Sequence, residues 1–207
     1  VTTSLTAPVD SLKKLGLTSL ENLHYQLNPE QLTEQAVQRG DGVLNDTGAL
    51  LINTGKYTGR SPKDKFTVKD ALTENTVHWN DFNIPFEEKY FFQLKEKMLV
   101  HLSGEELWVR DCYACAEEAY RLKIRVINEN PWSNLFIRPE EKDLENFEPQ
   151  WHIIQAPSFK ADPAVDGTRA ENFAVISFTH KTILIGGTGY TGEMKKGIFT
   201  ILNFVLP

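Results

Sequence analysis

The stretch of sequence that decides the fold runs from residue 173 to residue 206 and reads FAVISFTHKTILIGGTGYTGEMKKGIFTILNFVL. Two apolar runs, 173–178 and 182–185, flank the polar residues 179–181, which predicts two strands joined by a hairpin turn. A glycine-rich turn follows. Residues 193–206 then carry the pattern of an apolar helix that Pro207 ends. Strand, glycine-rich turn and helix in this order predict an α/β fold.

The rest of the chain supplies further strands and helices. We expect strands at 66–68, 107–112, 122–127 and 152–156, a buried strand at 49–54, and helices at 11–15, 29–39 and 85–102. Asn28 is expected to cap the second helix, which begins at Pro29 and ends at Gly40, and residues 41–46 are expected to form a polar turn. The simplest architecture is a single α/β domain with a mixed β-sheet flanked by helices.

The longest expected helix, 85–102, carries an apolar stripe. Its apolar positions recur every three or four residues: Phe86, Tyr90, Phe91, Leu94, Met98 and Leu102. This spacing puts them on one face of a helix, so we expect them in the core rather than around a cofactor.

Composition and charge argue against several classes of partner. The chain has 207 residues and a net charge of −6, which favours neither nucleic acid nor an anionic membrane. No apolar run approaches the roughly 20 residues that a membrane-spanning helix needs. The N-terminus shows no charged segment followed by an apolar run, as a secretory signal would. We therefore expect a cytoplasmic protein with no nucleic-acid or membrane partner.

The two cysteines, Cys112 and Cys115, are spaced as a C-x-x-C pair. A structural zinc site needs four ligands, and no second Cys or His pair stands at ligand spacing. A thioredoxin-like dithiol would open a helix, whereas this pair follows the expected strand at 107–112. We interpret the pair as reduced structural thiols. The five histidines are scattered, and the sequence shows no complete metal site.

The first segment that suggests chemistry is the loop at 54–66, which reads TGKYTGRSPKDKF. Four basic residues fall within ten positions, together with two glycines. Arginine grips a carboxylate or phosphate through two parallel hydrogen bonds, which makes Arg60 the candidate residue. Ser-Pro and Lys-Asp are also common in turns, so a solvated basic turn is the alternative.

The second such segment is the glycine-rich turn at 185–197, where backbone N–H groups can meet an anion. Gly187 and Gly192 have the spacing of a P-loop. However, Glu193 and Met194 stand where a P-loop has Lys and Ser or Thr, so we reject a P-loop here.

Lys195 and Lys196 are placed in the first turn of the expected helix, where the helix dipole disfavours cations. Their position is explained if an anion binds there, or if one lysine is held neutral as a ligand. The alternative is that both extend into solvent at a small cost.

Together the two segments resemble the ATP-dependent phosphoenolpyruvate carboxykinases. The string TGRSPKDK at 58–65 is similar to one signature of that family and GEMKKG at 192–197 to another, and their order and separation fit. The resemblance covers nearly the whole chain, more weakly before residue 51. Gly189 and Thr191 depart from the family pattern, which has Trp and Gly at these positions.

The resemblance implies a reaction and roles for four residues. The family converts oxaloacetate and ATP into phosphoenolpyruvate, ADP and CO2, a step of gluconeogenesis that uses Mn²⁺ and Mg²⁺. By resemblance, Arg60 holds the substrate carboxylate or CO2, and Tyr190 lines the pocket for them. Lys196 is a neutral metal ligand that also contacts the substrate and the γ-phosphate of ATP, with Lys195 adjacent. Arg60, Lys195 and Lys196 are the catalytic candidates.

The resemblance also implies that residues 1–207 form the N-terminal, substrate-side domain of a larger carboxykinase. The P-loop for ATP, most metal ligands and further substrate arginines would then lie in a C-terminal domain beyond this chain. The apolar segment 197–206 fits such a missing partner, although it fits packing within this domain equally well. On this hypothesis the isolated chain is inactive. The alternatives are a stand-alone, non-catalytic module that binds carboxylate or phosphate, and an adaptor domain with a basic turn.

Overall fold

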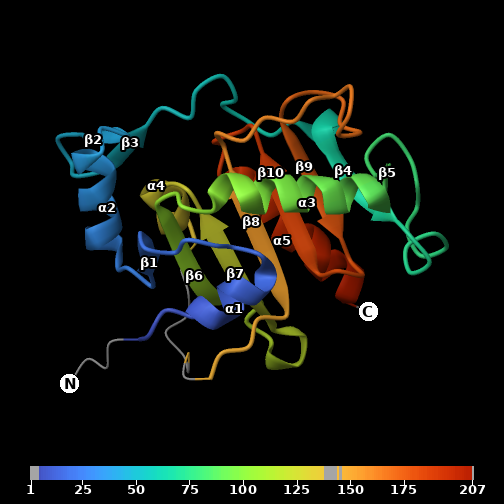
Figure 1. The fold of residues 1–207 in the computed structure, drawn as a ribbon, viewed down its shortest axis with the longest axis horizontal. Coiled ribbons are helices and arrows are strands. Elements are labelled where there is room, and N and C mark those ends of the chain that lie inside the picture. Colours follow the sequence, from blue (N-terminus) through green and yellow to red (C-terminus); the bar gives the residue numbers. More distant parts are fainter. Residues whose placement is uncertain (1–4, 138–143, 145, 207) are drawn as a thin grey trace.

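The computed structural model describes residues 5–137, 144 and 146–206. Its centre is a mixed eight-stranded sheet in the order β1–β6–β7–β8–β10–β9–β4–β5. The strands are β1 (Leu23–Tyr25), β4 (Lys65–Lys69), β5 (Ile84–Glu87), β6 (Leu107–Ala114), β7 (Leu122–Asn128), β8 (Trp151–Ala156), β9 (Phe173–Ser177) and β10 (Thr182–Gly186). A separate hairpin of β2 (Gly42–Leu44) and β3 (Leu50–Ile52) lies beside α2 (Pro29–Gln38), away from the sheet (Figure 1).

Helices cover both faces of the sheet (Figure 1). The core on one face includes side chains of α1 (Val9–Leu15) and α3 (Glu88–Leu102), and the core on the other includes side chains of α5 (Gly192–Val205). Side chains alternate across a strand, so Leu184 of β10 joins the first core while its neighbours Ile183 and Ile185 join the second. The described residues thus form an α/β domain with a mixed sheet flanked by helices, as the sequence predicts.

The order of the strands brings the two candidate segments to one edge of the sheet. Strand β9 runs antiparallel to β10 and parallel to β4, so β4 begins at the level where β10 ends. Ala174 of β9 pairs with Ile185 on one side and with Lys65 on the other. The loop that precedes β4 therefore meets the glycine-rich turn that follows β10.

Most of the expected elements are confirmed to within about two residues at each end. The hairpin at 173–185 and the strands β4, β6, β7 and β8 are present, as are α1, α2 and α5. Asn28 caps α2: its side chain accepts a hydrogen bond from the backbone N–H of Gln31, whose own side chain accepts from the N–H of Asn28. Gly40 follows the helix with a φ of +74°, which suits glycine. Pro207, expected to end α5, lies outside the described residues.

Three expectations were wrong. The helix expected from Pro85 begins at Glu88, because Ile84–Glu87 pairs with β4 as an extra parallel strand. Phe86 is still buried in the core, from that strand rather than from the helix. Residues 41–46 are not simply a turn, since β2 lies among them and pairs with β3. The strand expected at 49–54 exists as β3, but it is not buried: Leu51 is 53% exposed, because a two-stranded hairpin outside the main sheet has little to cover it.

The sequence reading also missed two short elements, β1 and α4 (Pro131–Leu135), which are too brief to show a period. Across 5–137, 144 and 146–206, no helix is long and apolar enough to cross a lipid bilayer.

Candidate functional site

The loop before β4 and the turn after β10 pack against each other through backbone. At Gly187, with a φ of +70°, a Cβ atom would come within 2.6 Å of the carbonyl oxygen of Glu171. At Gly189, a Cβ atom would lie 3.2 Å from the carbonyl oxygen of Thr54, in the first loop. Lys56 and Tyr57 of that loop reach the side chain of Glu171 at 3.2 Å and 3.4 Å. Glycine is needed at Gly187, because its φ is left-handed and the backbone of Glu171 approaches closely.

Two acidic side chains hold the loop that carries Arg60. The buried Glu193 in the first turn of α5 accepts a hydrogen bond at 2.8 Å from the backbone N–H of Ser61, the residue after Arg60. Asp64, also buried, pairs with Arg169 through two hydrogen bonds of 2.9 Å each. Such two-point pairing fixes orientation as well as distance. The loop is therefore fastened on both sides of Pro62.

Lys65, at the end of this loop, forms a second connection between the loop and α5. Its Nζ donates to Thr200 Oγ1 at 2.6 Å, and Thr200 Oγ1 donates to the carbonyl oxygen of Lys196 at 2.9 Å. Burial lowers the pKa of Lys65; the charges of Lys196 and Arg60 lower it further, and the charge of Glu193 opposes them. Arg60, Lys196 and Glu193 therefore all lie within electrostatic reach of Lys65.

The predicted site residues differ in how they are placed. Arg60 is exposed, and its side chain makes no hydrogen bond or ion pair within the part of the chain that the structure describes. Lys196 is half-buried, with its Nζ 4.5 Å from the centre of the Phe199 ring. Tyr190 is half-buried and its ring lies against Gly192. Lys195 is exposed and is not among the charges that act on Lys65. The structure thus places Arg60 and Lys196, but not Lys195, among the charges that act on Lys65.

The position of the lysines on α5 refines the sequence argument. Because α5 begins at Gly192, Lys195 is in the first turn and Lys196 comes just after it. The first turn also contains an acid, Glu193, which favours the positive end of the helix dipole. The lysines are therefore not alone at this helix start, and the acid beside them is already engaged with Ser61.

This arrangement suits a carboxylate or phosphate better than a metal ion held by this chain alone. Lys65 lies within reach of the charges of two other basic side chains, Arg60 and Lys196, and of one carboxylate, Glu193, that already accepts a hydrogen bond. Mg²⁺ and Mn²⁺ favour oxygen ligands, and among the described residues no group of three His, Cys, Asp or Glu side chains could hold a metal. Of the described residues, Lys196 remains the candidate for a single nitrogen ligand.

The two departures from the family pattern are accommodated without visible strain. Trp132 of α4 lies against Gly189, so that a Cβ atom there would be 3.2 Å from the indole ring. An aromatic side chain thus does lie beside the turn, but it comes from α4. Thr191 has φ −66° and ψ −23°, which a β-branched residue adopts readily.

The cysteines fit the interpretation as reduced structural thiols. Both are free. Cys112 is buried on β6, and burial, helped by the charge of Asp111, raises the pKa of its thiol to about 12. A thiol held protonated is a poor nucleophile and a poor metal ligand.

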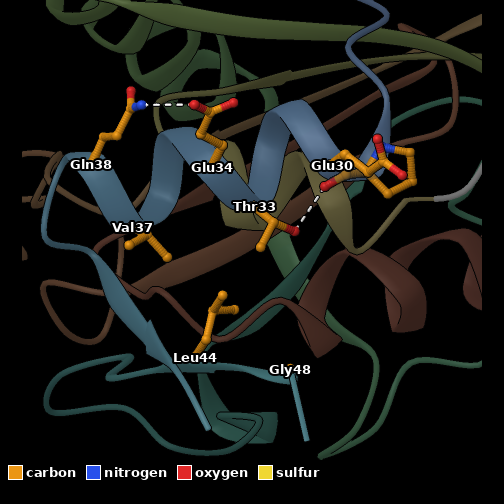
Figure 2. A pocket seen from close by; sticks show the side chains of 8 residues that line it. Glu30, Thr33, Glu34, Val37, Gln38, Leu44 and Gly48 are labelled. Carbon is orange, nitrogen blue, oxygen red and sulfur yellow. Dashed lines mark hydrogen bonds between the residues drawn. The ribbon is translucent and has the colours of Figure 1, made fainter. Parts of the chain in front are cut away.

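A groove that the sequence did not predict lies between α2 and the β2–β3 hairpin, with a volume of about 520 Å³. Figure 2 shows Val37 of α2 and Leu44 of β2 pointing toward one another across it. Its charged lining residues are acidic, Glu30 and Glu34, so it does not suit the anion expected at Arg60.

Sequence reasoning missed the residues that hold the site together. Glu193 and Lys65 stood inside the quoted motifs but had no role, and Arg169 was not singled out. The signal for Glu193 was its place as the only acid in a helix start rich in lysine. Nothing in the sequence showed that its partner is the backbone of Ser61.

Comparison with known proteins supports the resemblance to the carboxykinases. The sequence profile of the family described as phosphoenolpyruvate carboxykinase matches residues 21–207. Proteins named phosphoenolpyruvate carboxykinase (ATP) from Christiangramia forsetii and Flavobacterium johnsoniae are each 54% identical over 202 residues, which is 95% of this chain and 38% of theirs. A protein from Moorella thermoacetica named phosphoenolpyruvate carboxykinase (ATP) 2 is 46% identical over 201 residues, 95% of this chain and 38% of its own.

The chain thus spans about two fifths of the length of these relatives and corresponds to their N-terminal portion. The match includes both segments at the edge of the sheet. The chain belongs to the ATP-dependent phosphoenolpyruvate carboxykinase family.

Proposed function

We propose that residues 1–207 are the N-terminal, substrate-side domain of an enzyme that converts oxaloacetate and ATP into phosphoenolpyruvate, ADP and CO2. The observation that carries the proposal is that hydrogen bonds join the loop of Arg60 and Lys65 to the helical turn of Lys196 at one edge of the sheet, in a member of this family. Such an enzyme would act in gluconeogenesis. It would be cytoplasmic, with neither nucleic acid nor membrane as a partner.

The chemistry of this reaction explains why the edge of the sheet that holds Arg60, Lys65 and Lys196 is basic. Breaking the bond between the departing carboxylate and the neighbouring carbon of oxaloacetate releases CO2 and leaves an enolate. The enolate oxygen then attacks the γ-phosphorus of ATP, and ADP departs. Substrate, enolate and transferring phosphoryl group are all anionic, so cations fixed in advance stabilise the charge as it moves.

Each candidate site residue of this chain has a role in that scheme. Arg60, which is free of internal partners among the described residues, binds the substrate carboxylate or the departing CO2 through its guanidinium group. Tyr190 lines the same pocket. Lys196 contacts the substrate and the γ-phosphate of ATP, with Lys195 beside it.

The rest of the enzyme supplies what this chain lacks. The divalent ion, Mn²⁺ or Mg²⁺, stabilises negative charge on the reacting oxygens when it is bound. Lys196 is the ligand that this chain would contribute. The remaining metal ligands and the ATP site are assigned to the C-terminal part of the enzyme.

The test is alanine substitution in a full-length carboxykinase that carries this segment. We expect Arg60→Ala and Lys196→Ala each to lower kcat/KM for oxaloacetate by about 100-fold or more. Lys63→Ala is the matched control, because Lys63 is an exposed lysine of the same loop, and it should change kcat/KM by less than about threefold. An Arg60→Ala enzyme with unchanged kcat/KM would overturn the proposal and leave the loop as a basic turn.

A second candidate is a module that binds a small carboxylate or phosphate without catalysis. It is favoured by one observation: all three basic side chains belong to this chain. Calorimetry with oxalate and phosphoenolpyruvate separates the two. A half-site should bind either ligand poorly without the rest of the enzyme and show no turnover, whereas a module should bind well alone. Formation of phosphoenolpyruvate by the 207-residue chain would contradict the split site.

A further inference from the structure

We infer that Glu193 is a positioning residue that sets Arg60 against Lys196. The inference rests on the proposed function, because it assigns a task to a residue that need not touch the substrate. It concerns the contact between Glu193 and the backbone N–H of Ser61.

The contact is well placed for that task. Glu193 is only 6% exposed, so its carboxylate is held in a defined position rather than sampling solvent. Its Oε1 accepts from Ser61 at 2.8 Å, and Ser61 adjoins Arg60. A hydrogen bond to a charged, buried acceptor is stronger than an ordinary one. Movement of Arg60 away from α5 would break it.

A second connection runs in the opposite direction. Lys65, at the end of the same loop, donates to Thr200 on α5, and Thr200 in turn donates to the carbonyl oxygen of Lys196. Thus α5 holds the residue beside Arg60, and the loop holds the helical turn that carries Lys196. These two connections hold the backbone beside Arg60 and the helical turn of Lys196 together from both sides.

The charge of Glu193 assists its geometry. Arg60 and Lys196 both repel Lys65 until an anion binds, and Glu193 is the acid whose charge opposes them. Arg60 is exposed and has no side-chain partner among the described residues, so without Glu193 its loop would move outward into water. Glu193 therefore keeps the site assembled before the substrate arrives.

The competing explanation is that Glu193 merely offers a negative charge to the start of α5. Any acid in a first turn does this, including the exposed Glu30 in the first turn of α2. Burial and the contact with Ser61 are what Glu193 has in addition. The experiment must therefore separate hydrogen bonding from charge.

The test uses Glu193→Ala, Glu193→Gln and Glu193→Asp in the full-length carboxykinase that carries this segment. Glu193→Ala should raise KM for oxaloacetate about tenfold or more, as expected for loss of a charge-assisted hydrogen bond, and change KM for ATP by less than about twofold. Glu193→Gln should recover most of the loss, because the amide oxygen still accepts from Ser61, and the part that remains lost is due to the missing negative charge. Glu193→Asp keeps the charge but is one methylene shorter, so it should be impaired more than Glu193→Gln. Glu30→Gln is the control for a first-turn charge.

A double-mutant comparison identifies Arg60 as the residue being positioned. Once Arg60 is alanine, adding Glu193→Ala should lower kcat/KM for oxaloacetate by less than about twofold, because residues acting as one unit are not additive.

The other outcomes would overturn the inference. They are equal increases in both KM values, full additivity with Arg60→Ala, or a Glu193→Ala enzyme that loses thermal stability while keeping its KM for oxaloacetate. If Glu193→Ala does not fold, the order of Glu193→Gln and Glu193→Asp decides the matter. A strong effect of Arg60→Ala beside an inert Glu193→Ala would reject this inference alone, whereas an inert Arg60→Ala would reject the proposed function as well.

Discussion

At the scale of single residues, the fold imposes unusual protonation on groups that lie away from the site. His152 on β8 is paired in register with Arg125 on β7. Burial lowers the pKa of its imidazole to about 4, with the charges of Arg125 and Lys95 acting in the same direction. His152 is therefore neutral in the folded protein at any pH near neutrality.

This pKa predicts how stability depends on pH. Between pH 6.5 and pH 4 the unfolded chain protonates His152 and the folded chain does not, so stability falls as the pH falls through this window. The loss should be roughly 2 kcal/mol between pH 7 and pH 5. Urea unfolding of the chain and of His152→Gln at both pH values checks it. The variant should lose less stability on acidification, and an identical loss in both proteins would contradict the assignment.

At the scale of elements, the turn after β10 depends on Gly187. Its φ of +70° is costly for other residues, and a Cβ atom would meet the backbone of Glu171 and Asn172 at 2.6–2.8 Å. Neither neighbour can move aside as a flexible side chain would. The turn therefore constrains the start of α5 through its backbone.

Gly187→Ala should destabilise the protein by about 2 kcal/mol or more, from left-handed strain and overpacking together. Gly40→Ala is a matched control: Gly40 has a similar φ of +74°, but no atom of the described residues lies within 4 Å of a Cβ there. It should therefore carry the strain alone and cost less. Thermal unfolding of both variants gives the comparison, and equal losses would show that the contact with Glu171 and Asn172 has no effect.

The elements also show where sequence patterns were sufficient. Long apolar runs predicted β9, β10 and α5, because each is buried in the core and its pattern reflects that burial. Phe86 continues the three- and four-residue spacing of the apolar face of α3, and proline is common at the first position of a helix. The boundary between β5 and α3 was therefore hidden in the sequence. Only the neighbouring strand β4 makes Ile84–Glu87 extended, and that neighbour is not local in the sequence.

For the candidate site, individual side chains could be proposed from the sequence, whereas their arrangement could not. Arg60 and Lys196 follow from residue type and motif. Two contacts depend on the order β10–β9–β4: Lys65 donates to Thr200 of α5, and Glu193 accepts a hydrogen bond from the backbone N–H of Ser61. Strand order is a property of the whole sheet, so no local pattern records it.

At the scale of the whole molecule, the fold consists of a central sheet covered by helices and a small separate hairpin, β2–β3, beside α2 (Figure 1). Strands β7, β8 and β10 have neighbours on both sides and helices over their faces. The β2–β3 hairpin has exposed apolar residues, Val43, Leu44 and Leu51, and belongs to no larger sheet. Local stability should differ accordingly.

Hydrogen exchange can measure this difference. Backbone amides of β7, β8 and β10 should exchange only through global unfolding, while those of β2 and β3 should exchange at least about 100-fold faster through local opening. Mass spectrometry of peptic fragments resolves the two regions. Similar protection in the hairpin and the central strands would contradict the division.

The contact between Ser61 and Glu193 also has a consequence for the order of events during synthesis. Its two residues are 132 positions apart in the chain. A ribosome adding about 5–20 residues per second would expose the loop many seconds before its anchor is made. Contacts of such long range close late, because the entropy of a large loop must be overcome first. The nascent protein therefore carries Arg60 on an unfastened loop, and the contact that joins this loop to α5 forms among the last parts of this domain.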